Sequence, residues 1–543
     1  MGNLSQQASN LTVGLSGLKA SWRQDIVAGF LVFLIALPLC LGVAVASGFP
    51  PMAGILSAIV GGLLVSRLNG SHVTITGPAA GLIVVILTAV QSLGQGDAMA
   101  GYRYTLAAVV VAGGLQIALA LYKAGRLAAF FPASVVHGML AAIGIIIMAK
   151  QIPVMVGVQT TGETLLSSIT ELPHGLAYFV PEIAFIAMVG MGILIGWPLI
   201  GNRFLRKVPA PILVIGSGMI LGKLFDLDQL RPGESFMVPK DVILGPAFLV
   251  SIPDSIIASI YFPDFSKVFT LAFWESVVAI TLVGSLESLL STAAVDKLDP
   301  QKRYSDLNRD LRAVGIGNTI SGLIGGLPMI AEIVRSSANV DAGAQTGWAN
   351  FFHGAFLLFV VMIFPFVIDT IPLASLAALL VYTGFRLASP KAFARTLDLG
   401  REQLALFVIT IAGVLATNLL AGVLIGIAAK LLIHVARGVP LRNLLAISYR
   451  MERSEPNTCV IHVSGSAIFS NFIALKSELA DLPHGKHVIF DLSDAYLIDH
   501  TVMELIDQYR KDYDERGGHC EIRGLSDHES YADHALAARI IKQ

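Results

Sequence analysis

Charged residues are scarce in this chain of 543 residues. Asp, Glu, Lys and Arg make up 14% of it, whereas hydrophobic residues make up 55%. Soluble domains carry roughly a quarter charged residues, so most of this chain cannot surround a core with a charged surface in water. The shortage is uneven, because 27 of the 75 charged residues lie in residues 441–543. We therefore expect a long apolar part that meets lipid and a shorter charged part that meets water.

Cysteine is rare, and basic charge is not in excess. Cys40, Cys459 and Cys520 lie far apart, which argues against a disulfide framework and a cysteine-based metal site. The formal net charge of −1 argues against a broad surface for nucleic acid. The sequence has no phosphate-binding loop of the Gly-x-x-x-x-Gly-Lys-Ser/Thr type. It therefore predicts no enzyme, no resident cofactor and no nucleic-acid partner.

About fourteen apolar segments occur, in two sets of seven. A spanning helix needs about 20 apolar residues, and several of these segments are shorter. The turn Gly48-Phe49-Pro50-Pro51 separates the first two within residues 26–66. The remaining segments are residues 73–93, 104–122, 127–148, 183–200 and 210–222 in the first set, and residues 269–290, 313–326, 333–340, 348–368, 371–384, 404–419 and 421–436 in the second.

The basic residues predict the topology. Lys and Arg favour short cytoplasmic loops, and here they precede the first segment and follow the second, fourth, sixth, eighth and twelfth, with Arg103 as an exception. The connection at 153–182 contains none, as an external loop should. We expect a multi-pass protein of the inner or plasma membrane with both ends cytoplasmic. The expected parts are a cytoplasmic segment (1–21), a transmembrane domain (22–438, with halves at about 22–225 and 265–438) and a cytoplasmic domain (439–543).

The third and tenth segments are interrupted in matching places. The third opens with residues 76–81 (Thr-Gly-Pro-Ala-Ala-Gly) and the tenth with residues 325–330 (Gly-Gly-Leu-Pro-Met-Ile). Gly and Pro are commoner in membrane helices generally, but a matched pair favours a transporter site built from inverted repeats. The unpaired amide groups at two facing half-helix starts would attract an anion.

Two groups of charges remain near the membrane interior. Glu287 has Ser291 four residues later on the same helical face, a pair suited to a hard cation such as Na⁺ or to a coupling proton. The alternative is an interfacial carboxylate neutralised by loop lysines, although an intramembrane carboxylate is functional by default. Glu332 and Arg335 are one turn apart and could pair with each other. Because they follow the break at Pro328, we place them in or beside the site.

The charged C-terminal part alternates strands and helices. Strands are predicted at residues 458–463, 487–492 and 520–525, and helices at 472–482 and 501–515. Such alternation is typical of a small parallel sheet. Since it offers no recognisable nucleophile–base pair, we expect a regulatory or dimerising module.

Several short segments, taken in their joint order, have a pattern in common with a known family. They are residues 76–81, 125–132, 150–153, 287–290, 308–311 and 322–328, with 490–493 and 497–501 in the C-terminal part. Together they resemble the sulfate permease (SulP) family of anion transporters with a C-terminal STAS domain. The resemblance implies an α-helical polytopic membrane protein with fourteen segments in a seven-plus-seven inverted repeat, divided into core and gate domains. It also implies an elevator-type movement and a homodimer.

The resemblance also implies the site residues. An anion would bind between the third and tenth segments, and members that couple bicarbonate to sodium hold Na⁺ at positions matching Glu287 and Ser291. The expected anion-site residues are Pro78, Ala79, Ala80, Gly81, Ala331, Glu332, Ile333 and Arg335.

Three positions depart from the family pattern. Ala79 replaces a frequent hydroxyl residue, and Glu332 replaces a small uncharged one. A carboxylate so near an anion site would repel substrate unless it is protonated or paired, which makes proton coupling at Glu332 a rival to sodium coupling. His500 stands where a phosphorylatable Ser is frequent, so we do not expect a phosphorylation switch there.

These inferences predict a secondary active transporter of a small inorganic anion, driven by Na⁺ or H⁺. Bicarbonate is favoured over sulfate because Glu287 and Ser291 suit a sodium site. Proton symport of sulfate or a dicarboxylate, and anion exchange, are the alternatives within this class. An alternative of another class is a membrane-anchored STAS signalling protein without transport.

Overall fold

The structure is a computed structural model. It describes residues 15–542 apart from 79, 124–131, 159–178, 201–207, 233–242, 254, 302, 418, 445, 456–457, 473–474, 476–477, 480–481, 483–486 and 516. The chain forms two compact units. The first comprises Met1–Gly125 and Ile143–Arg386, and the second comprises Arg126–Ala142 and Leu387–Gln543.

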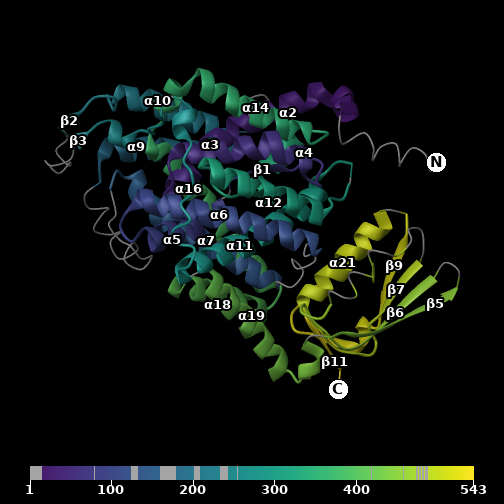
Figure 1. Ribbon diagram of the computed structural model, residues 1–543. Coiled ribbons are helices and arrows are strands. Elements are labelled where there is room, and N and C mark those ends of the chain that lie inside the picture. Colours follow the sequence, from purple (N-terminus) through teal and green to yellow (C-terminus); the bar gives the residue numbers. More distant parts are fainter. Residues whose placement is uncertain are drawn as a thin grey trace. The chain divides into compact units, whose positions relative to one another are not determined.

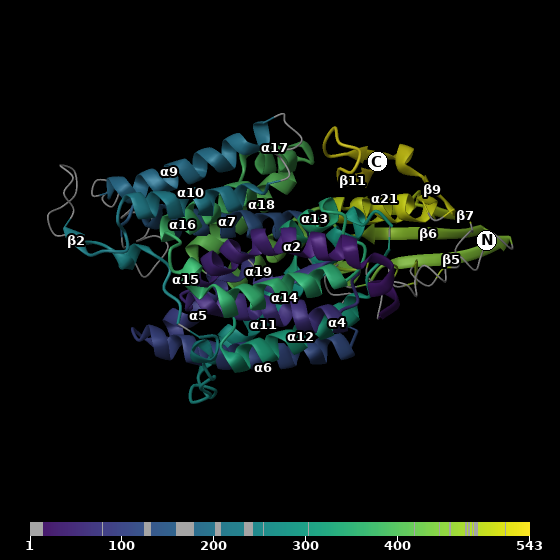
Figure 2. The same ribbon diagram turned by 90° about the horizontal axis from the view of Figure 1, so that it is seen from above.

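The first unit is built almost entirely from apolar helices (Figures 1 and 2). Within the described residues of the whole chain, eight helices are long and apolar enough to cross a membrane. The elements of its first half are α2 (Leu15–Ala46), α3 (Pro51–Val60), η1 (Gly61–Val65), α4 (Ser66–Leu68), β1 (Ile75–Pro78), η2 (Ala80–Leu82), α5 (Ile83–Gly94), α6 (Ala98–Leu121), α7 (Ala133–Met155, which begins in the second unit), α9 (Pro181–Gly196), η4 (Trp197–Leu199) and α10 (Ala210–Leu224).

The second half of this unit repeats the pattern. After two short strands, β2 (Arg231–Pro232) and β3 (Ile243–Leu244), it contains α11 (Leu271–Leu298), α12 (Leu307–Ile324), β4 (Met329–Glu332), α13 (Ile333–Asp341), α14 (Trp348–Ile363), α15 (Pro365–Ile368) and α16 (Leu373–Leu387). Local interactions fix both ends of α12. Asp306 caps α12 by accepting the amide protons of Asn308 and Arg309, and Gly325 ends it in the left-handed conformation with φ 93°.

The packing of the helices repeats between the two halves. Helix α2 packs against α14, and its counterpart α11 packs against α6. Likewise α5 packs against α11, and α13 packs against α2. Figure 2 shows α2 beside α14, with α12 beside α6. First-half elements therefore meet second-half elements in reciprocal pairs, which is consistent with the predicted inverted repeat.

The two interrupted segments meet as a pair of short antiparallel strands. β1 pairs with β4 in a register that sets Thr76 opposite Ala331 and Pro78 opposite Met329. Pro78 and Pro328 remove backbone donors, so neither stretch can continue a helix. After its strand, each of the two segments becomes helical again, the first at Ala80 and the second at Ile333. The predicted breaks are thus extended strands that cross inside the first unit.

The second unit combines apolar helices with a β-sheet domain. Its helices are α17 (Pro390–Asp398), α18 (Arg401–Ala416) and α19 (Leu419–Ala436), and α21 (His500–Glu515) packs on the sheet (Figure 1). Strands β6, β7, β8 and β9 are parallel neighbours, and β5, β10 and β11 add antiparallel pairs. The strands are β5 (Ser448–Glu455), β6 (Thr458–Ala467), β7 (His487–Asp491), β8 (Ala495–Ile498), β9 (His519–Arg523), β10 (His528–Ser530) and β11 (Arg539–Ile541).

The expectation of a purely parallel sheet was therefore incomplete, because the three antiparallel strands lie outside the alternating pattern. The three predicted strands and the helix at 501–515 agree with β6, β7, β9 and α21. Much of the helix predicted at 472–482 lies outside the described residues. The core of this domain is apolar, with Ile461, Phe472, Phe490, Ile498 and Val502 all nearly inaccessible.

Candidate functional site

Side chains from three helices hold the crossing of β1 and β4. Ser336 of α13 accepts a hydrogen bond from the Ile75 amide at 2.8 Å, and Ser288 of α11 accepts one from the Ala331 amide at 3.1 Å. Asn318 of α12 accepts from the Met329 amide at 2.6 Å. The extended backbone is therefore fixed by polar side chains within an apolar interior, which keeps the starts of α5 and α13 in place.

Asn318 is a supporting residue that the sequence reading missed. It is 1% exposed, and its Nδ2 donates to Gln116 Oε1 at 2.8 Å and to the Met329 carbonyl at 3.2 Å. Gln116 is itself fully buried. The sequence could have indicated this contact, because amide side chains such as Asn318 and Gln116 are rare inside apolar membrane helices and usually have a polar partner.

Arg335 of α13 lies at the crossing of β1 and β4. Its side chain is 1% exposed, and Nη2 donates to the Pro78 carbonyl at 2.9 Å. Its Nε and Nη1 have no hydrogen-bond partner among the described residues. A Cβ at Gly77 would lie 2.6 Å from Nη1, so any larger residue there would have to displace this guanidinium. A buried cation with unused donors is the arrangement that an anion would complete.

Glu332 and Arg335 do not form the direct pair that their spacing allows. Among the described residues, no ion pair joins them, and the described hydrogen bond of Arg335 goes to Pro78. Glu332 is the last residue of β4, with extended φ −106° and ψ 110°, so helical spacing does not hold between the two. The two charges still act on each other electrostatically.

Glu287 adjoins the start of the third segment. Its side chain is buried, and neither carboxylate oxygen has a hydrogen-bond partner among the described residues. A Cβ at Gly81 would collide with this carboxylate. The charge of Glu332 also acts on Glu287. The structure thus brings the predicted cation position against the predicted anion position.

The other predicted site residues have no described side-chain hydrogen bond at the strand crossing, or lie outside the described residues. Ser291 is half-buried one turn beyond Glu287, Ala80 is half-buried in η2, and Ala331 is buried in β4. Ile333 is 42% exposed, so its contribution is confined to its backbone at the start of α13. Ala79 lies outside the described residues.

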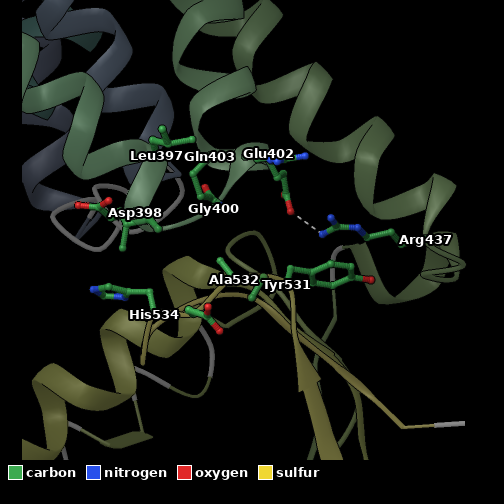
Figure 3. Close-up of a pocket in the computed structure, with 13 residues that line it drawn as sticks. Leu397, Asp398, Gly400, Glu402, Gln403, Arg437, Tyr531, Ala532 and His534 are labelled. Atoms are coloured by element: carbon green, nitrogen blue, oxygen red, sulfur yellow. Dashed lines mark hydrogen bonds and ion pairs between the residues drawn. The ribbon is translucent and has the colours of Figure 1, made fainter.

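A cavity of about 730 Å³ lies in the second unit, bounded by α18, the end of α19 and the segment after β10 (Figure 3). Arg437 donates to Glu402 at 2.5 Å and stacks on the Tyr531 ring at 3.9 Å. Lys430 donates to the other oxygen of Glu402 at 2.7 Å. Arg437 and Lys430 are thus both paired with Glu402, whereas Arg335 at the strand crossing has unused donors.

Residues 499–501 form the loop in which the family frequently has a phosphorylatable residue, and in this chain their side chains are buried. His500 is 3% exposed, with Nδ1 2.7 Å from the Leu536 carbonyl, and Thr501 is 8% exposed. Asp499 accepts the amide protons of Val502 and Phe469, each at 2.8 Å. The hydroxyl of Thr501, next to His500, is therefore buried.

Two families match the chain. The sulfate permease family matches residues 22–412, and the STAS domain matches residues 449–528. Among curated proteins, the bicarbonate transporter BicA of Synechocystis sp. is 24% identical over 87% of this chain and 82% of its own length. Sulfate transporter 4.1, chloroplastic, of Arabidopsis thaliana is 22% identical over 91% of this chain and 74% of its own length.

Solved structures share the fold. The transmembrane domain of a cyanobacterium bicarbonate transporter BicA has a TM-score of 0.61 and 24% identity, covering 76% of this chain and 97% of that domain. The overall structure of SLC26A9 has a TM-score of 0.66 and 13% identity, covering 93% of this chain and 85% of that one. These matches confirm the predicted fold class, a polytopic helical protein with a C-terminal STAS domain.

Proposed function

The chain belongs to the sulfate permease family, and from this premise we propose that it is a secondary active transporter of a small inorganic anion, with bicarbonate favoured over sulfate. The observation that carries the proposal is Arg335, a buried guanidinium with two unused nitrogens at the crossing of β1 and β4. An anion there would meet this charge together with the starts of α5 and α13. The relatives named as bicarbonate and sulfate transporters support both substrates.

The coupling ion in this proposal binds at Glu287. Its buried carboxylate has no hydrogen-bond partner among the described residues, and hard cations prefer oxygen ligands. Na⁺ would bind Glu287 with the Ser291 hydroxyl, which makes bicarbonate with Na⁺ the favoured pair. Glu332 offers a proton-coupled alternative, because a protonated carboxyl would not repel the anion.

The movement proposed is of the elevator type, in a homodimer with cytoplasmic N-terminus and STAS domain. The strands β1 and β4 would travel with the helices that hold them through Ser288, Asn318 and Ser336. Since these hydrogen bonds join α11, α12 and α13 to the strands, the site can move as one body without losing its shape.

Uptake by proteoliposomes tests the proposed coupling. Labelled bicarbonate and sulfate are offered separately, each with an imposed Na⁺ gradient or pH gradient. We expect the Na⁺ gradient to drive bicarbonate accumulation in the wild-type protein, and Glu287→Gln to abolish that drive. If only the pH gradient drives uptake and Glu332→Gln removes its effect, the proton-coupled alternative holds. Absence of flux under every gradient would favour a signalling role.

A further inference from the structure

Gln116 of α6 is a fully buried amide inside the first unit. Its Oε1 accepts a hydrogen bond from Asn318 Nδ2 at 2.8 Å, and its Nε2 donates to Ser285 Oγ of α11 at 3.4 Å. A polar side chain buried in an apolar helix is costly unless it is hydrogen-bonded, and this one is bonded at both ends of its amide group. Gln116 therefore connects α12, which holds the strand crossing, to α11, which carries Glu287.

The backbone of β4 sets the direction of each hydrogen bond in this network. The Met329 N–H can only donate, so Asn318 presents Oδ1 to it at 2.6 Å and Nδ2 to the Met329 carbonyl at 3.2 Å. Because Nδ2 of Asn318 also faces Gln116, the oxygen of Gln116 must face Asn318 and its nitrogen must face Ser285. Only this arrangement of donors and acceptors makes all four bonds, so the network specifies a single geometry.

Close backbone contacts hold Gln116 against α12 and bring α11 up to it. A Cβ at Gly113, three residues before Gln116, would lie 2.6 Å from the Thr319 amide nitrogen, so α6 and α12 touch along their backbones. At Gly284 of α11, a Cβ would lie 3.3 Å from Gln116 Nε2 and 3.9 Å from Ile330 Cγ2 of β4. Gln116 is therefore fixed to α12, and it contacts α11 where α11 also approaches β4.

Helix α11 holds β4 at two points. Ser288 accepts the Ala331 amide proton directly, at 3.1 Å, and Ser285 is joined to Met329 through the two amide side chains. Glu287 lies between the two serines in the sequence. The part of α11 that carries the proposed cation ligand is therefore attached to the strand that leads into α13.

Resting on the proposed function, we propose that Gln116 is a positioning residue through which a cation at Glu287 raises the anion affinity of Arg335. A bound cation neutralises Glu287 and draws its carboxylate into coordination, which displaces this part of α11. The displacement reaches Met329 through Gln116, and β4 leads directly into α13, which carries Arg335. Because coupling between two sites is reciprocal, the bound anion raises the cation affinity by the same factor.

The test is the effect of Na⁺ on anion affinity in Gln116→Met, which keeps the length of the side chain and removes its amide. The half-saturating concentration of labelled bicarbonate, or of sulfate if only sulfate is taken up, is measured in proteoliposomes with equal Na⁺ on both sides and again with K⁺ in its place. We expect Na⁺ to lower it about fivefold or more in wild-type protein. In Gln116→Met we expect about twofold or less, because only the direct attraction between cation and anion remains. Gln91→Met, at an exposed position of α5, should keep the wild-type ratio.

Ser285→Ala breaks the same connection at its other end, and its small change of volume keeps the test available if Gln116→Met does not fold. It should lower the Na⁺ effect as Gln116→Met does. The double variant should lower it no further, since both changes break one connection. A double variant whose loss is the sum of the two single losses overturns the proposal.

Failure of the proposed function gives a different result. A wild-type protein that takes up the anion with an affinity indifferent to Na⁺ overturns the cation site at Glu287, and the role of Gln116 with it. A Gln116→Met protein that binds the anion more weakly with and without Na⁺ but keeps the wild-type ratio overturns only the role of Gln116, which is then structural. The two failures are therefore distinguishable.

Discussion

At the scale of single residues, the site depends on glycines that face charges. Gly77 faces the Arg335 guanidinium, and Gly81 faces the Glu287 carboxylate. In each pair, the missing side chain lets a buried charge lie against the backbone of the third segment. Specificity for a small anion is expected where backbone and charge are this close, because little room is left for a larger group.

Gly81→Ala tests this contact. The added methyl group collides with the Glu287 carboxylate, so we expect a loss of about 1–3 kcal/mol in the free energy of unfolding and a loss of cation-driven uptake. Gly114→Ala in α6 is the matched control, since its Cβ would have nothing within 4 Å. Thermal unfolding in detergent and uptake are measured for both. Equal behaviour of the two variants would show that Gly81 does not adjoin Glu287.

At this scale the sequence predicted the charges but not their partners. Glu287, Glu332 and Arg335 were found because charge is rare in apolar segments. Their hydrogen bonds were not predictable, since Pro78 and Arg335 are 257 residues apart and meet only in the folded chain. Helical spacing suggested a Glu332–Arg335 pair, but the strand β4 ends at Glu332 and removes the helical geometry on which that pair depended.

At the scale of elements, a buried contact between His434 and Asp499 joins α19 to the start of α21. His434 Nε2 of α19 lies 3.5 Å from Asp499 Oδ2, and both side chains are fully buried. Asp499 lies at the start of α21, where it accepts the Val502 amide proton. Burial acts to raise the pKa of Asp499, but the interaction with His434 and the charge of Lys430 outweigh it and hold that pKa below its usual 3.8.

Asp499→Ala should therefore destabilise the protein at neutral pH. A carboxylate with a depressed folded-state pKa stabilises the fold above its unfolded pKa, and this contribution is lost as the pH falls from 3.8 through the folded value. We expect a loss of about 1–3 kcal/mol at pH 7 from the missing cap and the lost contact with His434, with the difference from wild type shrinking below pH 3.8. Asp494→Ala, on the surface, is the control. A constant difference at all pH values would contradict this assignment.

Apolar runs and strand–helix alternation predicted most elements, and the short or charged elements were missed. Long apolar runs located the membrane helices but missed several of their ends, since α2 begins at Leu15 and not at residue 26, and α11 ends at Leu298 and not at residue 290. The amphipathic helix α17 and the strands β5, β8, β10 and β11 were not predicted, because they are short or charged and take their structure from neighbours. The crossing of β1 and β4 was predicted as two breaks, and only their pairing in space shows that they form strands.

At the scale of the whole molecule, the site and the STAS domain belong to different units. The strands β1 and β4 and the residues that hold them lie in the first unit, whereas the STAS domain lies in the second. We therefore expect truncation after Ser448 to preserve anion uptake in part. The rate should fall, because α19 loses the contact of His434 with Asp499. Uptake of the labelled anion by truncated and full-length protein at equal reconstituted amounts measures this, and complete loss in a folded truncated protein would contradict it.

The most direct test of the central claim is anion uptake by Arg335→Gln. The wild-type protein and Arg386→Gln, which changes an exposed arginine at the end of α16, serve as references. Uptake of labelled bicarbonate and sulfate is measured in proteoliposomes under Na⁺ and pH gradients. The account predicts that Arg335→Gln loses at least tenfold in uptake at low anion concentration, equivalent to about 1.4 kcal/mol, while Arg386→Gln keeps the wild-type rate. Wild-type uptake by a folded Arg335→Gln protein would contradict it.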